Sequence, residues 1–274
     1  MDLHNIHGEL LRRRVRVLVV GSGGTGSAVA AGLPYLHQAM IANGHPAGLN
    51  VTLMDGDVIS PTNCVRQPFS RSEVGLHKAV VLVNRLNVFW GLDWQAVPRN
   101  LEQGARIDEA DIVIGCVDTR AARAVIQDCT SNWSRTHYWL DIGNNTDSGQ
   151  FVLGEPLNQT NRRSRTRLRT VSELFPEIVD PQLDDDGLPS CSEAEALERQ
   201  EPFVNSTLAH HALALLARLF RYAMVSYHGG LISLETGSSG RLPVDAAVWR
   251  RLRRRSMERP ARGMSAGAGQ RRVA

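Results

Sequence analysis

The sequence predicts an α/β protein whose mainly parallel, Rossmann-like sheet is flanked by helices. Short apolar runs of strand length alternate along the chain with segments whose apolar residues recur at helical spacing. The glycine-rich stretch 21–26 lies between the first apolar run and the first helical segment, which is typical of a strand, a tight turn and a helix. Strands that alternate with helices form parallel sheets with right-handed crossovers, so this order of segments indicates one such sheet.

The individual elements are assigned in chain order. Residues 15–20 are mostly valine, which is typical of a buried strand. Pro34 should kink or break the helix after the glycines, because proline lacks an N–H and clashes inside a helix. A helix then resumes at 37–41. Further strands are expected at 51–54, 94–97, 112–117, 138–143 and 231–234, and further helices at 78–88, 119–129 and 207–222.

Composition divides the chain into four parts. Residues 1–155 carry the alternating strand and helix pattern. Residues 156–206 form a polar, weakly patterned crossover region that contains Cys191. Residues 207–249 add a helix and a strand that complete the same domain. Residues 250–274 are a basic tail, for which a disordered state is one interpretation.

Arginine is concentrated in two stretches, 162–169 and 250–255, although the net charge of the whole chain is only +3. Such stretches are either solvated or bind nucleic acid or acidic partners, and we favour the solvated interpretation. The aromatic residues are few and dispersed, so no stacking platform for bases is indicated. Nucleic acid is therefore a possible partner but not the favoured one.

Cysteine spacing and hydropathy exclude several classes of protein. No two of the four cysteines are spaced as CxxC, so neither a disulfide framework nor a four-thiolate zinc site is expected. The N-terminal residues lack an apolar signal core, and no apolar run approaches the length of a membrane span. We therefore expect a cytoplasmic protein with no zinc and no membrane partner.

The glycine turn predicts a nucleotide site. Without a Cβ atom the backbone can approach a phosphate closely, and the following helix directs its free N–H groups at the anion. The glycines concerned are Gly21, Gly23, Gly24 and Gly26. Asp55 and Asp57 follow the second strand, where an acidic residue commonly holds ribose hydroxyls. These features alone would suit an NAD-binding dehydrogenase equally well.

The charged residues that follow favour a triphosphate. The block from Asn63 to Gln67 includes Arg66, and Lys78 begins the next helix. Arg66 and Lys78 can neutralise phosphate oxygens, and Asp118, which closes the strand at 112–117, can hold Mg²⁺ on the others. A dehydrogenase has no use for this combination.

These motifs resemble the ThiF/MoeB/HesA adenylyltransferases, which are related to ubiquitin-activating enzymes. The resemblance rests on Asp-x-Asp at 55–57, Asn-x-x-Arg-Gln at 63–67, Gly-x-x-Lys-Ala at 75–79 and the strand-end Asp118, and it covers about residues 15–155 well. The lengthened first crossover, the Trp94 segment and residues 189–197 are most similar to the PRTRC-system ThiF branch.

The resemblance implies an ATP-dependent enzyme that adenylates the C-terminal carboxylate of a small ubiquitin-like or sulfur-carrier-like protein and works as a homodimer. Residues 1–155 would then be the ATP-binding adenylation region. The implied nucleotide-binding residues are Gly21, Gly23, Gly24, Gly26, Asp55, Asp57, Asn63, Arg66, Gln67 and Lys78, with Asp118 binding Mg²⁺. Arg66, Lys78 and Asp118 would act in catalysis. In related enzymes an N-terminal arginine of the partner reaches ATP; Arg13 or Arg14 could take this role, or the three adjacent arginines before the first strand could equally be solvated.

Several alternatives stay open. Cys191 is either a nucleophile that takes the acyl group as a thioester or a structural cysteine. Asn144 and Gln150 either shape the site for the substrate's tail or are turn residues. As a whole, the chain could instead be an NAD(P)-dependent oxidoreductase or a non-catalytic adaptor that binds nucleotide.

Overall fold

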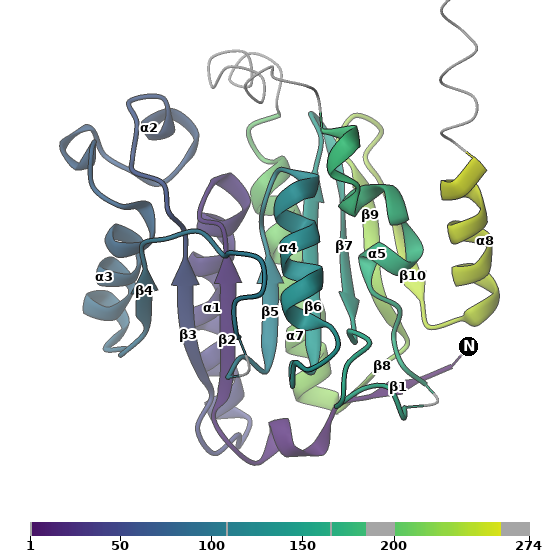
Figure 1. Ribbon diagram of the computed structural model, residues 1–274. Coiled ribbons are helices and arrows are strands. Elements are labelled where there is room, and N and C mark those ends of the chain that lie inside the picture. Colours follow the sequence, from purple (N-terminus) through teal and green to yellow (C-terminus); the bar gives the residue numbers. More distant parts are fainter. Residues whose placement is uncertain (1, 108, 165, 185–200, 259–274) are drawn as a thin grey trace, which may run out of the picture.

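The computed structural model describes residues 2–107, 109–164, 166–184 and 201–258, which form one eight-stranded sheet between helices (Figure 1). The strand order is β10-β9-β7-β6-β5-β2-β3-β4. The parallel strands are β2 (Val15–Val20), β3 (Leu49–Met54), β4 (Gln95–Val97), β5 (Ile112–Gly115) and β6 (Tyr138–Asn144). The antiparallel extension consists of β7 (Ser148–Gly154), β9 (Tyr227–Ser233) and β10 (Ser238–Pro243). The predicted α/β class with a mainly parallel sheet is confirmed.

The helices cover both faces of the sheet. On one face, α1 (Gly24–Ala42) packs along α7 (Val204–Tyr222), and α3 (Lys78–Trp90) lies beside β3 and β4. The other face carries α4 (Arg120–Thr130), α5 (Val171–Leu174) and α8 (Ala246–Glu258) (Figure 1). The short elements are β1 (His4–Asn5) paired with β8 (Met224–Val225), α2 (Asn63–Arg66), and 3₁₀ turns at Gly8–Leu11, Arg71–Glu73, Pro176–Val179 and Pro181–Leu183.

The valine-rich and isoleucine-rich strands lie at the centre of the sheet because both of their faces are covered. Every residue of β5 is buried, and so is every residue of β2 except Arg16. Burial of an aliphatic side chain stabilises the fold by roughly 1.5–3 kcal/mol, so these strands hold the frame on which the loops at their carboxyl ends are carried. None of the helices in the described part of the chain has both the length and the apolar character needed to cross a bilayer.

The structure adds detail at two points: the first helix has no break at Pro34, and the first part of the basic tail is helical. Pro34 does not interrupt the first helix: α1 runs from Gly24 to Ala42 with Pro34 buried inside it. One missing hydrogen bond is tolerated there because α1 packs extensively against α7. Helix α8 occupies the first part of the expected basic tail, because Leu252 and the buried Ser256 lie against the body of the protein. Residues 259–274 lie outside the described residues.

Candidate nucleotide site

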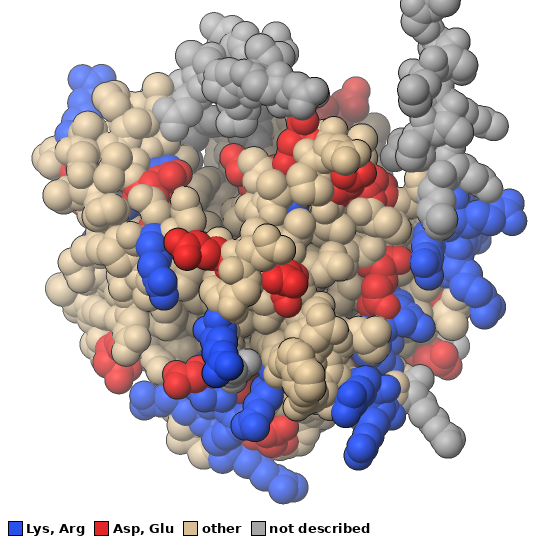
Figure 2. All heavy atoms as spheres, viewed as in Figure 1, with Lys and Arg blue, Asp and Glu red and all other residues tan. Residues whose placement is uncertain are grey.

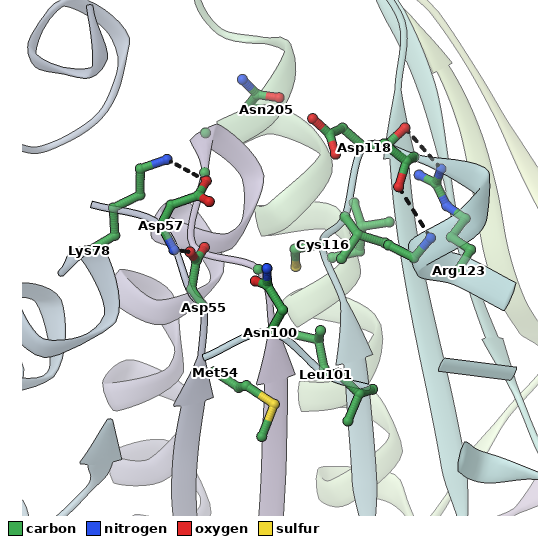
Figure 3. A pocket seen from close by; sticks show the side chains of 18 of the residues that line it. Met54, Asp55, Asp57, Lys78, Asn100, Leu101, Cys116, Asp118, Arg123 and Asn205 are labelled. Carbon is green, nitrogen blue, oxygen red and sulfur yellow. Dashed lines mark hydrogen bonds and ion pairs between the residues drawn. The ribbon is translucent and has the colours of Figure 1, made fainter. Parts of the chain in front are cut away.

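A cavity of about 670 Å³ opens at the carboxyl ends of β2, β3 and β5 (Figure 3). The chain passes from β2 to β3 on one side and later to β5 on the other, so strand order reverses at this point. In open α/β sheets such a reversal leaves a crevice where ligands bind. The predicted site residues that line the cavity are Gly21, Gly23, Gly24, Asp55, Asp57, Gln67, Lys78 and Asp118.

The glycines of the turn have two structural roles: some allow close backbone packing, and one leaves open space in the cavity. Gly21 has φ of +92°, and a Cβ there would lie 2.6 Å from the carbonyl oxygen of Cys116. Gly26 lies outside the cavity lining, and a Cβ on it would collide with the carbonyl oxygen of Gly21. At Gly23, by contrast, a Cβ would meet no heavy atom within 4 Å. Gly21 and Gly26 therefore allow the turn to close, whereas Gly23 leaves open space at the N-terminus of α1.

The N-terminus of α1 points its first turn at the cavity. Gly23 is the N-cap and offers no side-chain cap, so the backbone N–H groups of the first turn meet no side-chain acceptor from it. Those groups and the positive end of the helix dipole attract anions. A phosphate is the natural ligand for such a helix end.

Asp55 is built into the wall of the cavity. Its side chain is buried, and one oxygen accepts hydrogen bonds from the backbone N–H and the hydroxyl of Ser22, the latter at 2.8 Å. The other oxygen accepts the backbone N–H of Asp57 at 2.7 Å. A carboxylate can accept about four hydrogen bonds, so Asp55 holds the turn in place and keeps capacity for one more donor, such as a ribose hydroxyl.

Lys78 enters the cavity from the start of α3. Its Nζ lies 3.0 Å from an oxygen of Asp57, and its backbone N–H donates to the carbonyl of Asp57 at 3.1 Å. The Lys78 side chain is only 7% exposed, whereas that of Asp57 is 64% exposed. A positive charge at a helix N-terminus is unfavourable by itself, so Asp57 compensates for it and fixes the position of the ammonium group.

The Asn-x-x-Arg-Gln block lies beside the cavity. Gln67 lines it, and its Oε1 is buried without a hydrogen-bond partner among the described residues. Asn63 lies outside the lining, and its Oδ1 accepts the backbone N–H of Ser60 at 2.9 Å. Arg66 belongs to α2, but its side chain lies outside the described part of the structure. Cys191 also lies outside the described residues.

The side of the cavity opposite Asp55 and Lys78 is lined by residues that follow β5 in the chain, among them Asp118 and Arg123. Asp118 is exposed there, and the guanidinium of Arg123 from α4 is buried behind it (Figure 3). Arg123 Nε lies 3.2 Å from an oxygen of Asp141, which is fully buried on β6. Burial raises the pKa of Asp141, and the charge and hydrogen bond of Arg123 oppose that shift. Burial also raises the pKa of Cys116, which disfavours the thiolate form that a nucleophile needs.

Amide side chains from three distant segments complete the rim. Asn205 on α7 accepts the hydroxyl of Thr25 at 2.9 Å, and Asn144 accepts the same hydroxyl at 3.3 Å. Asn100 accepts the backbone N–H of Gly56 at 3.0 Å. All three asparagines line the cavity, but Gln150 does not. Asn100 and Asn205 were missed by sequence reasoning, because only folding brings them to this edge of the sheet.

Arg13 and Arg14 directly precede β2, so they lie at the amino ends of the strands, whereas the cavity lies at the carboxyl ends. Arg13 makes a two-pronged ion pair with Asp111, with N–O distances of 2.7 and 2.8 Å. Arg14 lies 3.5 Å from Asp93. Neither lines the cavity of its own chain, so contact with ATP would have to occur in a partner's cavity.

The donor set fits a magnesium ion carried by phosphates better than one held by protein alone. Among the described residues no group of three His, Cys, Asp or Glu side chains is arranged to hold a metal. Asp118, however, lines the same cavity as the N-terminus of α1. Mg²⁺ is commonly bound by one or two carboxylates together with nucleotide phosphates and water, so Asp118 is the residue of this cavity that would hold such an ion.

The fold is a Rossmann-like domain, and its cavity lies at the carboxyl ends of the strands, where such folds bind nucleotides. The model of the ThiF family matches residues 7–235, and the chain belongs to this family. The match identifies the family as a whole, so the PRTRC branch stays a prediction.

Relatives with curated descriptions include two proteins named adenylyltransferase and sulfurtransferase UBA4. The one from Eremothecium gossypii is 32% identical over 136 residues, 48% of this chain and 28% of that protein. The one from Candida glabrata is 31% identical over 134 residues, 47% of this chain and 29% of that protein. The chain thus matches less than a third of the length of these relatives.

Among solved structures, E. coli MccB with ATP superposes with a TM-score of 0.55 at 17% identity, covering 85% of this chain and 64% of MccB. E. coli MccB with MccA gives the same TM-score and identity. At this level of identity the similarity shows the fold alone.

Proposed function

We propose that this protein uses ATP to adenylate a carboxylate, namely the C-terminus of a small ubiquitin-like or sulfur-carrier-like protein. The observation that carries the proposal is the arrangement of the first cavity, where Lys78, Asp118 and the open N-terminus of α1 surround one space. Triphosphate chemistry needs a cation, a magnesium ligand and anion-binding N–H groups close together.

The names of the relatives support the proposal. UBA4 of Eremothecium gossypii is named an adenylyltransferase and sulfurtransferase. E. coli MccB has been solved with ATP and, separately, with MccA. A shared fold does not by itself transfer a reaction, so the assignment to this chain depends on the residues of its own cavity.

In the proposed reaction, a carboxylate oxygen attacks the α-phosphorus of ATP and pyrophosphate leaves in line. No general base is required, because a carboxyl terminus is already ionised at pH 7. The main obstacle is repulsion between two anions. Lys78 and the first-turn N–H groups of α1 would neutralise and align the phosphates, and Asp118 would hold Mg²⁺. The ion supplies further neutralisation of the phosphate oxygens.

The entry path for the acyl substrate is proposed to pass Asn144 and Asn205, whose amides lie beside the glycine turn. A flexible, glycine-rich tail has exposed peptide groups, which amide side chains can bind.

We further propose that Cys191 takes the acyl group as a thioester. A conjugate that persists in Cys191→Ser would contradict that step. A homodimer and a cytoplasmic location also belong to the proposal.

The test is ATP–pyrophosphate exchange with small proteins that have exposed glycine termini and are encoded beside this chain. Exchange should depend on one of them and fall roughly ten- to hundredfold in Asp118→Asn, because a charge-assisted contact contributes about 1.5–3 kcal/mol. Asp93→Asn is the matched control, since Asp93 is exposed and lies outside the cavity. Equal exchange in Asp118→Asn and the wild type would contradict the assignment. So would protection against thermal unfolding by NADH but not by ATP with Mg²⁺.

A further inference from the structure

A second cavity, of about 530 Å³, lies between the segment 157–174 and helix α8. It shares no lining residue with the nucleotide cavity. Five of its lining residues are arginines, and one is a glutamate, Glu173. The arginines are Arg162, Arg167, Arg169, Arg250 and Arg253.

On one side of this cavity, Arg167 and Arg169 form ion pairs with Glu173. Arg167 is buried and makes two hydrogen bonds to Glu173, at 2.8 and 2.6 Å, and one to the carbonyl of Glu155 at 2.6 Å. Arg169 adds a third bond to Glu173 at 2.8 Å. Burial acts to raise the pKa of Glu173, but the hydrogen bonds, chiefly from Arg167, lower it to about 2. Glu173 therefore stays charged, and its carboxylate oxygens accept hydrogen bonds from Arg167 and Arg169.

Helix α8 forms the other wall and is anchored to the body. Leu252 and Trp249 pack against the core, and Ser256 donates a hydrogen bond to Glu177. Trp249 also donates from Nε1 to the carbonyl of Pro243 at 3.1 Å, and its ring lies edge-on to His228. Because this apolar side of α8 is buried, its arginines are held on the exposed side.

Within the described part of the chain, only two of the five arginines, Arg167 and Arg169, form an ion pair with a carboxylate. Among the residues that the structure describes, no carboxylate pairs with Arg162, Arg250 or Arg253. Figure 2 shows Lys and Arg gathered over α8 and over the lower right of the molecule. Like charges that face one cavity repel, so an anion bound there would remove an unfavourable interaction.

We propose that this second cavity, which we call the arginine groove, binds the phosphate backbone of nucleic acid. The guanidinium fork matches phosphate oxygens in pairs, and the groove contains no lysine. Arg251 and Arg255 are exposed on a neighbouring flank of α8, outside the lining of the groove, and they widen the basic surface around it, which suits a polymer with repeated charges better than one small anion. The proposed contacts are from guanidinium groups to phosphates, which carry no sequence information, so binding is independent of sequence.

The test is fluorescence anisotropy of labelled single-stranded and duplex oligonucleotides of 30 nucleotides, titrated with the full chain at several salt concentrations. The variant Arg162→Ala/Arg250→Ala/Arg253→Ala removes the unpaired charges. Each lost phosphate contact lowers the salt slope by about 0.7 for single strands, so three should lower it by about 2 and weaken binding roughly 100-fold at 0.1 M salt. The control Arg12→Ala/Arg218→Ala/Arg221→Ala removes the same charge from exposed positions outside the groove.

Loss of binding in the groove variant, with near-normal binding in the control and unchanged melting temperatures, supports the proposal. Equal binding by the wild type and the groove variant would overturn it, since other basic residues would then account for the affinity. Poly-glutamate of the same number of charges is the competitor. If it displaced the oligonucleotide as well as unlabelled nucleic acid does, the groove would be a site for acidic polypeptide, and the proposal would fail.

Discussion

Gly23→Ala should separate nucleotide binding from folding. Gly23 lines the nucleotide cavity, and a Cβ there meets no heavy atom of the protein within 4 Å. Its φ of −67° is accessible to alanine, and its ψ of −153° lies just beyond the edge of the β region, so the substitution adds only a small backbone strain. The added methyl group would therefore fill only space that a phosphate would occupy. We expect a folded protein with weakened affinity for ATP.

The magnitudes follow from the contacts. Alanine is a poorer N-cap than glycine, so Gly23→Ala should cost about 1 kcal/mol of unfolding free energy or less. Displacing a phosphate from one N–H group loses a charge-assisted hydrogen bond of about 1.5–3 kcal/mol, which weakens ATP binding roughly 10- to 150-fold. Gly26→Ala is the contrasting variant. Its Cβ would collide with the carbonyl oxygen of Gly21, and such overpacking costs about 3 kcal/mol.

Calorimetric titration with ATP and Mg²⁺ measures the affinity, and thermal unfolding measures the stability. For a chain of this size, 1 kcal/mol shifts the melting temperature by about 2–4 °C. Gly23→Ala should thus melt within about 4 °C of the wild type, and Gly26→Ala about 6–12 °C lower. Wild-type affinity for ATP in Gly23→Ala would refute the reasoning, because the phosphate could not then lie over the turn. So would a loss of stability in Gly23→Ala as large as that in Gly26→Ala.

Three further predictions concern single side chains. Lys78→Met should lower ATP–pyrophosphate exchange ten- to hundredfold and leave Asp57 unpaired, so an unchanged rate would exclude Lys78 from phosphate binding. Arg123→Leu should lower the unfolding free energy in urea by about 3–5 kcal/mol, because Asp141 would be buried without its partner. Adding Asp141→Leu should restore most of that loss, and no recovery would contradict the pairing. Burial lowers the pKa of His228 to about 4, so the unfolded chain binds that proton more readily. The unfolding free energy should therefore fall as pH drops from about 6.5 towards 4, by roughly 1 kcal/mol at pH 5.5, and this loss should shrink in His228→Gln.

Local patterns in the sequence were enough to predict the centre of the fold. The valine run of β2, the glycine turn and the aspartates after β3 lie close together along the chain, and each has a strong local preference. Lys78 is also placed by a local pattern, since it begins an apolar helix. The α/β class and the shared position of Asp55, Lys78 and Asp118 could therefore be predicted.

Other features depend on contacts between distant segments. Asn205 reaches Thr25 across 180 positions only because α7 packs along α1. Asp141 did carry a signal, as an acidic residue within an apolar strand, but its partner on α4 is set by the pairing of β5 with β6. Such contacts are decided by strand register and helix packing, which leave no periodic trace in either segment alone.

The residue pattern of this chain therefore determines its parallel sheet and the charged ends of its first strands, since both follow from hydrophobic periodicity and local turn chemistry. Folding decides the rest: that Pro34 stays within α1, that the arginine-rich segment of α8 is an anchored helix, and that it faces a second arginine-rich segment across a groove. The physical reason is that burial of an apolar face can hold a segment whose composition alone favours solvation.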